Sequence, residues 1–205
     1  MAQAEMTTAR MEAFSDGVIA IIVTIMVLEL KAPSDLHPSV LYALWPTFLS
    51  YALSYLTVAE YWVNHHHLLH HARRAESRVL WANILFLFFL SLVPFATAYL
   101  GQCRGGSFAV AVYSGALLLC GLSYNVLIRA VARQTRGDAT MEARHRAGRR
   151  KGLLALAVYT AAVVLAFRSP DIALLFDLFV AIIYFIPGAW IEPRGRDSLR
   201  GESAA

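Results

Sequence analysis

Six long apolar segments constrain the fold of this chain more than any other feature. A helix that crosses a membrane needs roughly 20 mostly apolar residues, and charged residues collect in the gaps between the segments. The composition agrees, since 58% of the 205 residues are hydrophobic and 16% are charged, against about 45–50% and about 25% in a soluble domain. We expect a single all-α integral membrane domain over residues 1–205, with six transmembrane helices at about 12–30, 39–63, 79–100, 107–128, 152–167 and 172–191.

The basic residues in the gaps predict the orientation of these helices. Membrane proteins carry an excess of lysine and arginine on the cytoplasmic side. In the predicted topology 15 basic residues lie on the side that holds both termini, and only Lys31, Arg104 and Arg168 lie on the other side. We therefore expect six crossings with both termini in the cytoplasm.

The most basic segment, Arg129–Lys151, raises the question of a nucleic-acid partner. Single-strand binding uses aromatic side chains interleaved with the cationic ones, and this segment has none. A loop that orients the chain and contacts anionic lipid headgroups explains the same charges. We expect membrane lipid, and no nucleic acid, as the partner of this segment.

The first apolar segment contains polar residues, which are costly inside a membrane and are usually functional. On a helix, Gly17, Ile21, Thr24 and Leu28 fall within an arc of roughly 60°, and Asp16 lies on a neighbouring face. Two interpretations of this stripe stay open. It packs against another helix through its small residues, or it lines a pore with aliphatic rings and one ring of hydroxyl groups.

The sequence around this stripe resembles the transmembrane protein 175 family, which includes the potassium channel of endosomes and lysosomes and its bacterial relatives. The resemblance begins with Arg10-x-x-x-Phe14-Ser15-Asp16-Gly17 and continues through the apolar run with Thr24 to Leu28-Glu29-Leu30. Further positions that resemble the family are Trp62, His66, Trp81, Asn83 and Pro94-Phe95.

The resemblance implies a bacterial-type member with one six-span repeat in the cell membrane, four copies of which would surround a central pore lined by the first span. It assigns Ile21 and Leu28 to a hydrophobic constriction and Thr24 to a hydroxyl layer linked to potassium preference. It also implies a support motif that holds the pore helix in place, at Arg10, Phe14, Ser15, Asp16, His66, Trp81 and Asn83. The resemblance thus predicts a homotetrameric, potassium-preferring channel for monovalent cations, without a cofactor.

Two details refine this expectation. The sequence has no Thr-Val-Gly-Tyr-Gly-like segment, so a potassium filter lined by backbone carbonyls is not available and selectivity would come from side chains. Asp16 lies near the inner membrane boundary and off the stripe, so we expect it to pair with Arg10, His66 or Asn83.

A cluster of histidines, His65–His71, suggests metal chemistry at first sight. Its His-x-x-His-His spacing resembles that of membrane di-iron hydroxylases and desaturases, but those enzymes need several such clusters on one side of the membrane, and this chain has only seven histidines. We expect neither a metal site nor an enzyme. Three interpretations stay open: a segment at the membrane interface, a contact from His66 to Ser15 or Asp16, and a pH sensor.

Glu60 and Asp177 are two more acids inside predicted spans. Proton-coupled transporters use such acids as relays, so a small proton- or cation-coupled secondary transporter is the alternative function. The inverted repeats and paired broken helices typical of that class are not evident in the sequence.

Overall fold

The computed structural model describes residues 7–33, 37–135, 137 and 139–185, and within them it contains helices and no strands. The all-helical fold predicted from the sequence is therefore confirmed. In chain order the helices are α1 (Thr8–Leu28), α2 (Pro38–Ala43), α3 (Trp45–His70), α4 (Ser77–Leu90), α5 (Val93–Gln102), α6 (Ser107–Ala132), α7 (Ala139–Leu165) and α8 (Pro170–Phe185).

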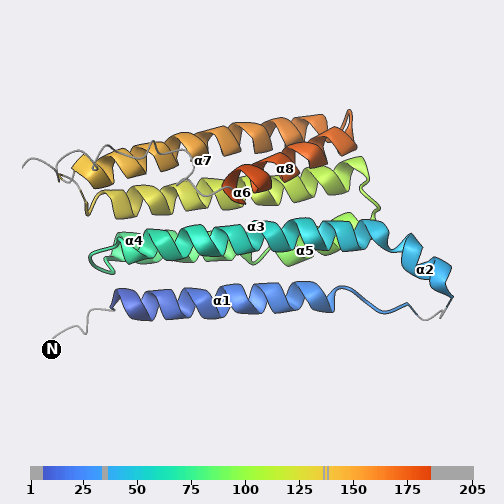
Figure 1. Ribbon diagram of the computed structural model, residues 1–205, viewed down its shortest axis with the longest axis horizontal. Helices are drawn as coiled ribbons and strands as arrows, with labels where there is room; N and C mark the ends of the chain where they lie inside the picture. Colours follow the sequence, from blue (N-terminus) through green and yellow to red (C-terminus); the bar gives the residue numbers. More distant parts are fainter. Residues whose placement is uncertain (1–6, 34–36, 136, 138, 186–205) are drawn as a thin grey trace, which may run out of the picture.

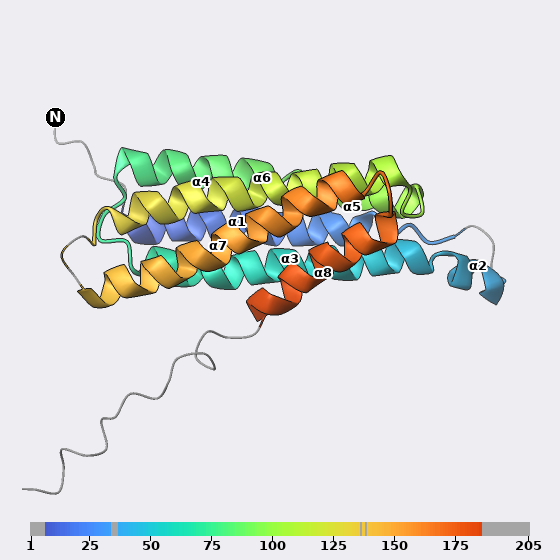
Figure 2. The same cartoon turned by 90° about the horizontal axis from the view of Figure 1, so that it is seen from above.

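The long helices run alongside one another in a bundle, with α1 at one edge and α7 at the opposite edge in Figure 1, and Figure 2 shows that α7 and α8 cross the other helices obliquely. Among the described residues, three stretches are long and apolar enough to cross a membrane: α1, α4 together with α5, and α6. They correspond to the first, third and fourth predicted spans.

The bounds of the other helices differ from the predicted spans. The second span is interrupted near its start at Leu44, which ends α2 and begins α3, and α3 continues to His70. The predicted fifth span covers the C-terminal half of the much longer α7. Arginine and glutamate in the first half interrupt the apolar pattern, but they are good helix formers, so the helix begins well before the span. The sixth span begins at Pro170 in α8, and residues 186–191 of its predicted range lie outside the described residues.

A break at Ser91 and Leu92 separates α4 from α5. Pro94 stands in the first turn of α5, where its missing N–H cannot bond the carbonyl four residues back. The Ser91 hydroxyl donates to the Phe88 carbonyl at 2.7 Å. The rod formed by α4 and α5 is therefore interrupted at this break, at a point that faces α1.

The core of the bundle is centred on α6, which packs mainly against α4, α5, α7 and α8 and also contacts α3. An aromatic cluster joins it to α3 and α4, where the ring centroids of Tyr61, Phe86 and Tyr124 lie 5.1–5.6 Å apart. By contrast the main contacts of α1 are with α3, α4 and α5. Within the residues that the structure describes, one long face of α1 is left exposed.

Candidate pore helix and its support

The two faces of α1 differ sharply in exposure. One face is buried against the bundle and consists of Met11, Ser15, Ile19, Ile22 and Met26. The stripe singled out in the sequence lies on the other side: Ile21 is 58% exposed and Leu28 74% exposed, and Thr24 is exposed between them. The described part of the chain therefore leaves most of the stripe uncovered.

Thr24 is the only hydroxyl of this stripe. Its Oγ1 donates to the carbonyl of Ile21 at 2.9 Å, so its proton is held within the helix. A hydroxyl oxygen has two lone pairs besides its proton. Thr24 can therefore offer an oxygen ligand to a cation on the exposed side of α1.

A buried polar chain fastens the opposite face of α1 to α3 and α4. The Asn83 side chain donates through Nδ2 to Ser15 Oγ at 2.8 Å, and its Oδ1 lies 2.7 Å from Nε2 of His65. Since Oδ1 can only accept, His65 donates through Nε2. All three side chains are buried. Ser15 also donates to the carbonyl of Met11 at 2.8 Å, so its hydroxyl links Asn83 to the backbone of α1.

Two more contacts lie beside this chain, on the same side of α1. Trp62 donates through Nε1 to Asp16 at 2.9 Å, and Nδ1 of His66 lies 2.7 Å from Glu12 Oε1. The expected partners of Asp16 were therefore wrong in detail, because Trp62 reaches it from α3. The expected contact of His66 with Ser15 or Asp16 is likewise replaced by a contact with Glu12, one turn nearer the start of α1.

The proposed support motif is brought together only in part. Ser15, Asp16, Asn83 and His66 belong to the network just described. Phe14 and Trp81 are 59% and 71% exposed, and Arg10 is also exposed, so the single chain does not bring these three into it.

Sequence reasoning missed Glu12 and His65. His65 could have been found from its spacing, because Val58, Tyr61, His65 and Leu68 recur every three or four residues and all are buried. A histidine on an apolar stripe of this period belongs to the core. Among the described residues no cluster of three or more metal-ligating side chains occurs, the histidines of α3 included.

The two acids that favour a transporter lie on the other side of the bundle. Asp177 of α8 is fully buried and accepts a hydrogen bond from Ser114 of α6 at 2.7 Å. Its second oxygen has no hydrogen-bond partner among the described residues. Glu60 lines a cavity of about 10 Å³, the size of one water molecule, between α3, α6, α7 and α8. Neither acid lies on the exposed stripe of α1.

Comparisons with known proteins place this arrangement in a family. The family described as the endosomal/lysosomal potassium channel TMEM175 matches residues 10–94. A protein named potassium channel from Chryseobacterium sp. (strain P1-3) is 39% identical over 188 residues, which cover 91% of this chain and 97% of the relative. The chain belongs to the TMEM175 family.

Other TMEM175 relatives agree with this assignment. A protein named potassium channel from Chamaesiphon minutus is 35% identical over 67% of this chain and 72% of the relative. The crystal structure of a lysosomal potassium-selective channel TMEM175 homologue from Chamaesiphon minutus matches with a TM-score of 0.76 at 29% identity, over 87% of this chain and 96% of that one.

The animal relatives match over a smaller part of their length. The human endosomal/lysosomal proton channel TMEM175 is 36% identical over 42% of this chain, which is 20% of the human protein. The family and these relatives are channels, not enzymes, which confirms that expectation from the sequence. The resemblance noted in the sequence is confirmed as well.

Proposed function

We propose that this chain is one subunit of a potassium-preferring cation channel in the bacterial plasma membrane, a homotetramer whose pore is lined by α1. The observation that carries the proposal is the exposed stripe of Ile21, Thr24 and Leu28 on a helix whose other face is anchored. One such helix cannot enclose a pathway, so several copies are required. Four copies would stack three rings of side chains along about 10 Å of pore axis, at about 1.5 Å per residue.

The membrane topology of the proposal has six spans. They are α1, α3, α4 with α5, α6, the C-terminal half of α7, and α8. The excess of arginine at the ends of α3 and α6 and at the start of α7 supports an orientation with both termini in the cytoplasm.

The three rings would act differently on an ion. Aliphatic rings of Ile21 and Leu28 cannot coordinate a cation, so they set a barrier of dehydration and dewetting. The Thr24 ring offers hydroxyl oxygens and sets the preference among cations. Such weak ligands give a modest potassium preference without a carbonyl-lined filter.

Ion flux from liposomes tests the proposal. Purified protein in vesicles should pass current down a potassium gradient with no co-substrate, and native mass measurement in detergent should give four chains. A stable monomer that conducts would contradict the tetramer. Flux that requires a proton or sodium gradient would contradict the channel and support the coupled transporter, for which the unsatisfied oxygen of Asp177 is the favouring observation.

A further inference from the structure

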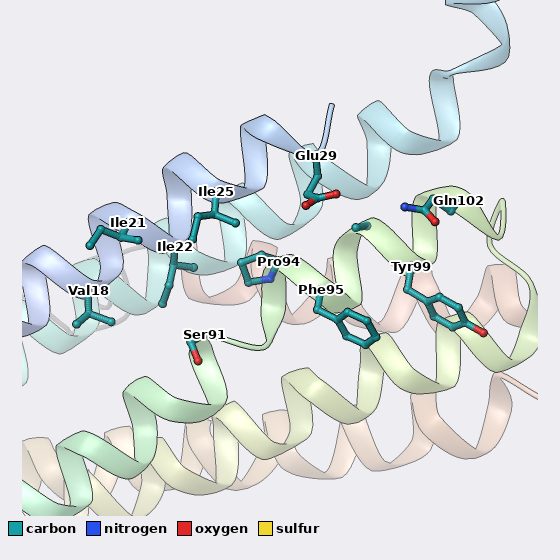
Figure 3. Close-up of a pocket in the computed structure, with 11 residues that line it drawn as sticks. Val18, Ile21, Ile22, Ile25, Glu29, Ser91, Pro94, Phe95, Tyr99 and Gln102 are labelled. Carbon is teal, nitrogen blue, oxygen red and sulfur yellow. The ribbon is translucent and has the colours of Figure 1, made fainter. Parts of the chain in front are cut away.

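A groove of about 500 Å³ lies between α1 and the bent rod of α4 and α5 (Figure 3). Its walls are apolar over most of their length, through residues such as Ile22, Ile25 and Phe95. Volumes of this order are typical of sites that hold a small molecule. The groove lies beside the break between α4 and α5, because Ser91 and Pro94 are among the residues that line it.

The two ends of the groove differ in polarity. Glu29 and Gln102 lie together at one end, and Val18 and Ser91 lie toward the other (Figure 3). Glu29 is the only ionisable carboxylate in the lining, and within the described part of the chain no salt bridge to it occurs. The groove thus has a carboxyl group at one end and a mostly apolar surface along the rest.

The length of the groove fits one leaflet of a membrane. Val18 and Glu29 are 11 positions apart on α1, which corresponds to about 16 Å at about 1.5 Å per residue. Half of the hydrocarbon core is about 15 Å thick. Because Glu29 ends α1, the charged end lies at headgroup depth and the apolar end near the middle of the bilayer.

We propose that this groove binds one aminolipid, a phospholipid whose headgroup ends in an ammonium group. An acyl chain would lie between α1 and α5, and the ammonium beside the Glu29 carboxylate. The amide of Gln102 supplies donors for the neighbouring phosphate. A hydrogen bond from the ammonium to the Glu29 carboxylate is charge-assisted, and this contact would select the headgroup by its charge. The proposal rests on the proposed placement of α1 across the membrane.

The position of the lipid gives it access to the pore helix. Ile21 and Ile25 line the groove, and Ile21 is also the proposed inner constriction residue. An acyl chain in the groove would support α1 on the side that the bend in α4 and α5 leaves open. Headgroup composition would then influence how α1 is held.

Native mass spectrometry of the purified full-length protein can test the site. The probes are phosphatidylethanolamine and phosphatidylglycerol with identical acyl chains, because only the first carries an ammonium. We expect the wild type to retain phosphatidylethanolamine about tenfold more strongly, the ratio expected when one charge-assisted hydrogen bond is added. Glu29→Gln should abolish this preference, whereas Asp171→Asn, which removes an exposed carboxylate outside the groove, should leave it unchanged.

A second pair of variants tests the apolar part. Ala98→Trp places a large side chain in the groove lining and should reduce retention of both lipids, whereas Ala157→Trp on the exposed face of α7 should not. Equal retention of the two lipids by the wild type, or an unchanged preference in Glu29→Gln, would overturn the proposal. Loss of the oligomer in Ala98→Trp with unchanged lipid retention would overturn it too, because a neighbouring chain would then occupy the groove.

Potassium flux measured on the same preparations separates this proposal from the proposed function. Flux without any headgroup preference overturns the lipid site alone. A headgroup preference without flux overturns the channel alone.

Discussion

Helices α1 and α6 are both long and apolar, yet the bundle buries them to different extents. Half of the most apolar 18-residue stretch of α6 is buried, against 28% of that of α1. Helix α6 contacts five other helices, α3, α4, α5, α7 and α8, whereas the main contacts of α1 are with three, α3, α4 and α5. An apolar sequence therefore indicates that a helix can enter a membrane. It does not indicate how many protein neighbours the helix has.

The polar residues of the two helices explain the difference. In α6 they are buried and bonded inside the bundle, as Ser114 is to Asp177. In α1 they are divided, with Ser15 bonded inward and Thr24 left on the exposed face. This division favours a helix that is anchored on one face and functional on the other.

The anchored face gives the largest expected effect. Asn83→Ala should lower the free energy of unfolding by about 2 kcal/mol, because it leaves the buried His65 donor without an acceptor. Unfolding in detergent, followed by circular dichroism, measures this loss. Ile84→Ala on the exposed side of α4 is the control and should stay within about 0.5 kcal/mol. Equal losses in the two variants would mean that the polar chain does not anchor α1.

Substitutions on the exposed face of α1 should change the conductance of the channel and leave the stability of the fold unchanged. Ile21→Asn or Leu28→Asn should raise the potassium current about tenfold, which corresponds to lowering the barrier by about 1.4 kcal/mol, because a polar ring wets the constriction. Currents are compared in bilayers at equal protein density, with Val27→Asn as the control on the neighbouring face. Unchanged currents in both variants would show that neither ring limits conduction.

The boundary between the two faces is tested at Asp16. Asp16→Ala removes the bond from Trp62 and should lower the stability of the assembly by about 1 kcal/mol, with unchanged ion selectivity. The tetramer fraction in detergent and the reversal potential are measured together. A well-assembled variant with altered selectivity would place Asp16 in the pore and break the separation of the faces.

The smallest effect is expected at Thr24. Thr24→Val keeps the shape of the side chain and removes the hydroxyl, so the potassium-to-sodium preference should fall severalfold, by about 1 kcal/mol or less. Reversal potentials in a potassium/sodium gradient measure it. Changes at Val23 or Val27 should not shift the potential, and a shift there with none in Thr24→Val would mean that another face of α1 lines the pore.

The sequence alone predicted the helical fold and the stripe on α1, because the length of the apolar segments indicates the helices and the spacing of residues along the first segment indicates the stripe. It could not decide between packing and pore lining for that stripe, since an apolar face looks the same against a helix, a lipid or a neighbouring copy. Which histidine is buried was also missed, because His65 and His66 differ by only about 100° around α3. The partner of Asp16 depends on how α1 and α3 cross, which no local pattern contains.

The most direct test of the account is the water accessibility of α1 in the assembled channel. Single cysteines at positions 21, 24, 28, 23 and 27 are placed in a Cys103→Ser background, which removes the exposed native thiol and keeps the buried Cys120. A charged, water-soluble thiol reagent is then added during potassium flux. We predict block at positions 21, 24 and 28 and unchanged flux at 23 and 27. Block at 23 and 27 without block at 21, 24 and 28 would contradict the claim that this stripe lines the pore.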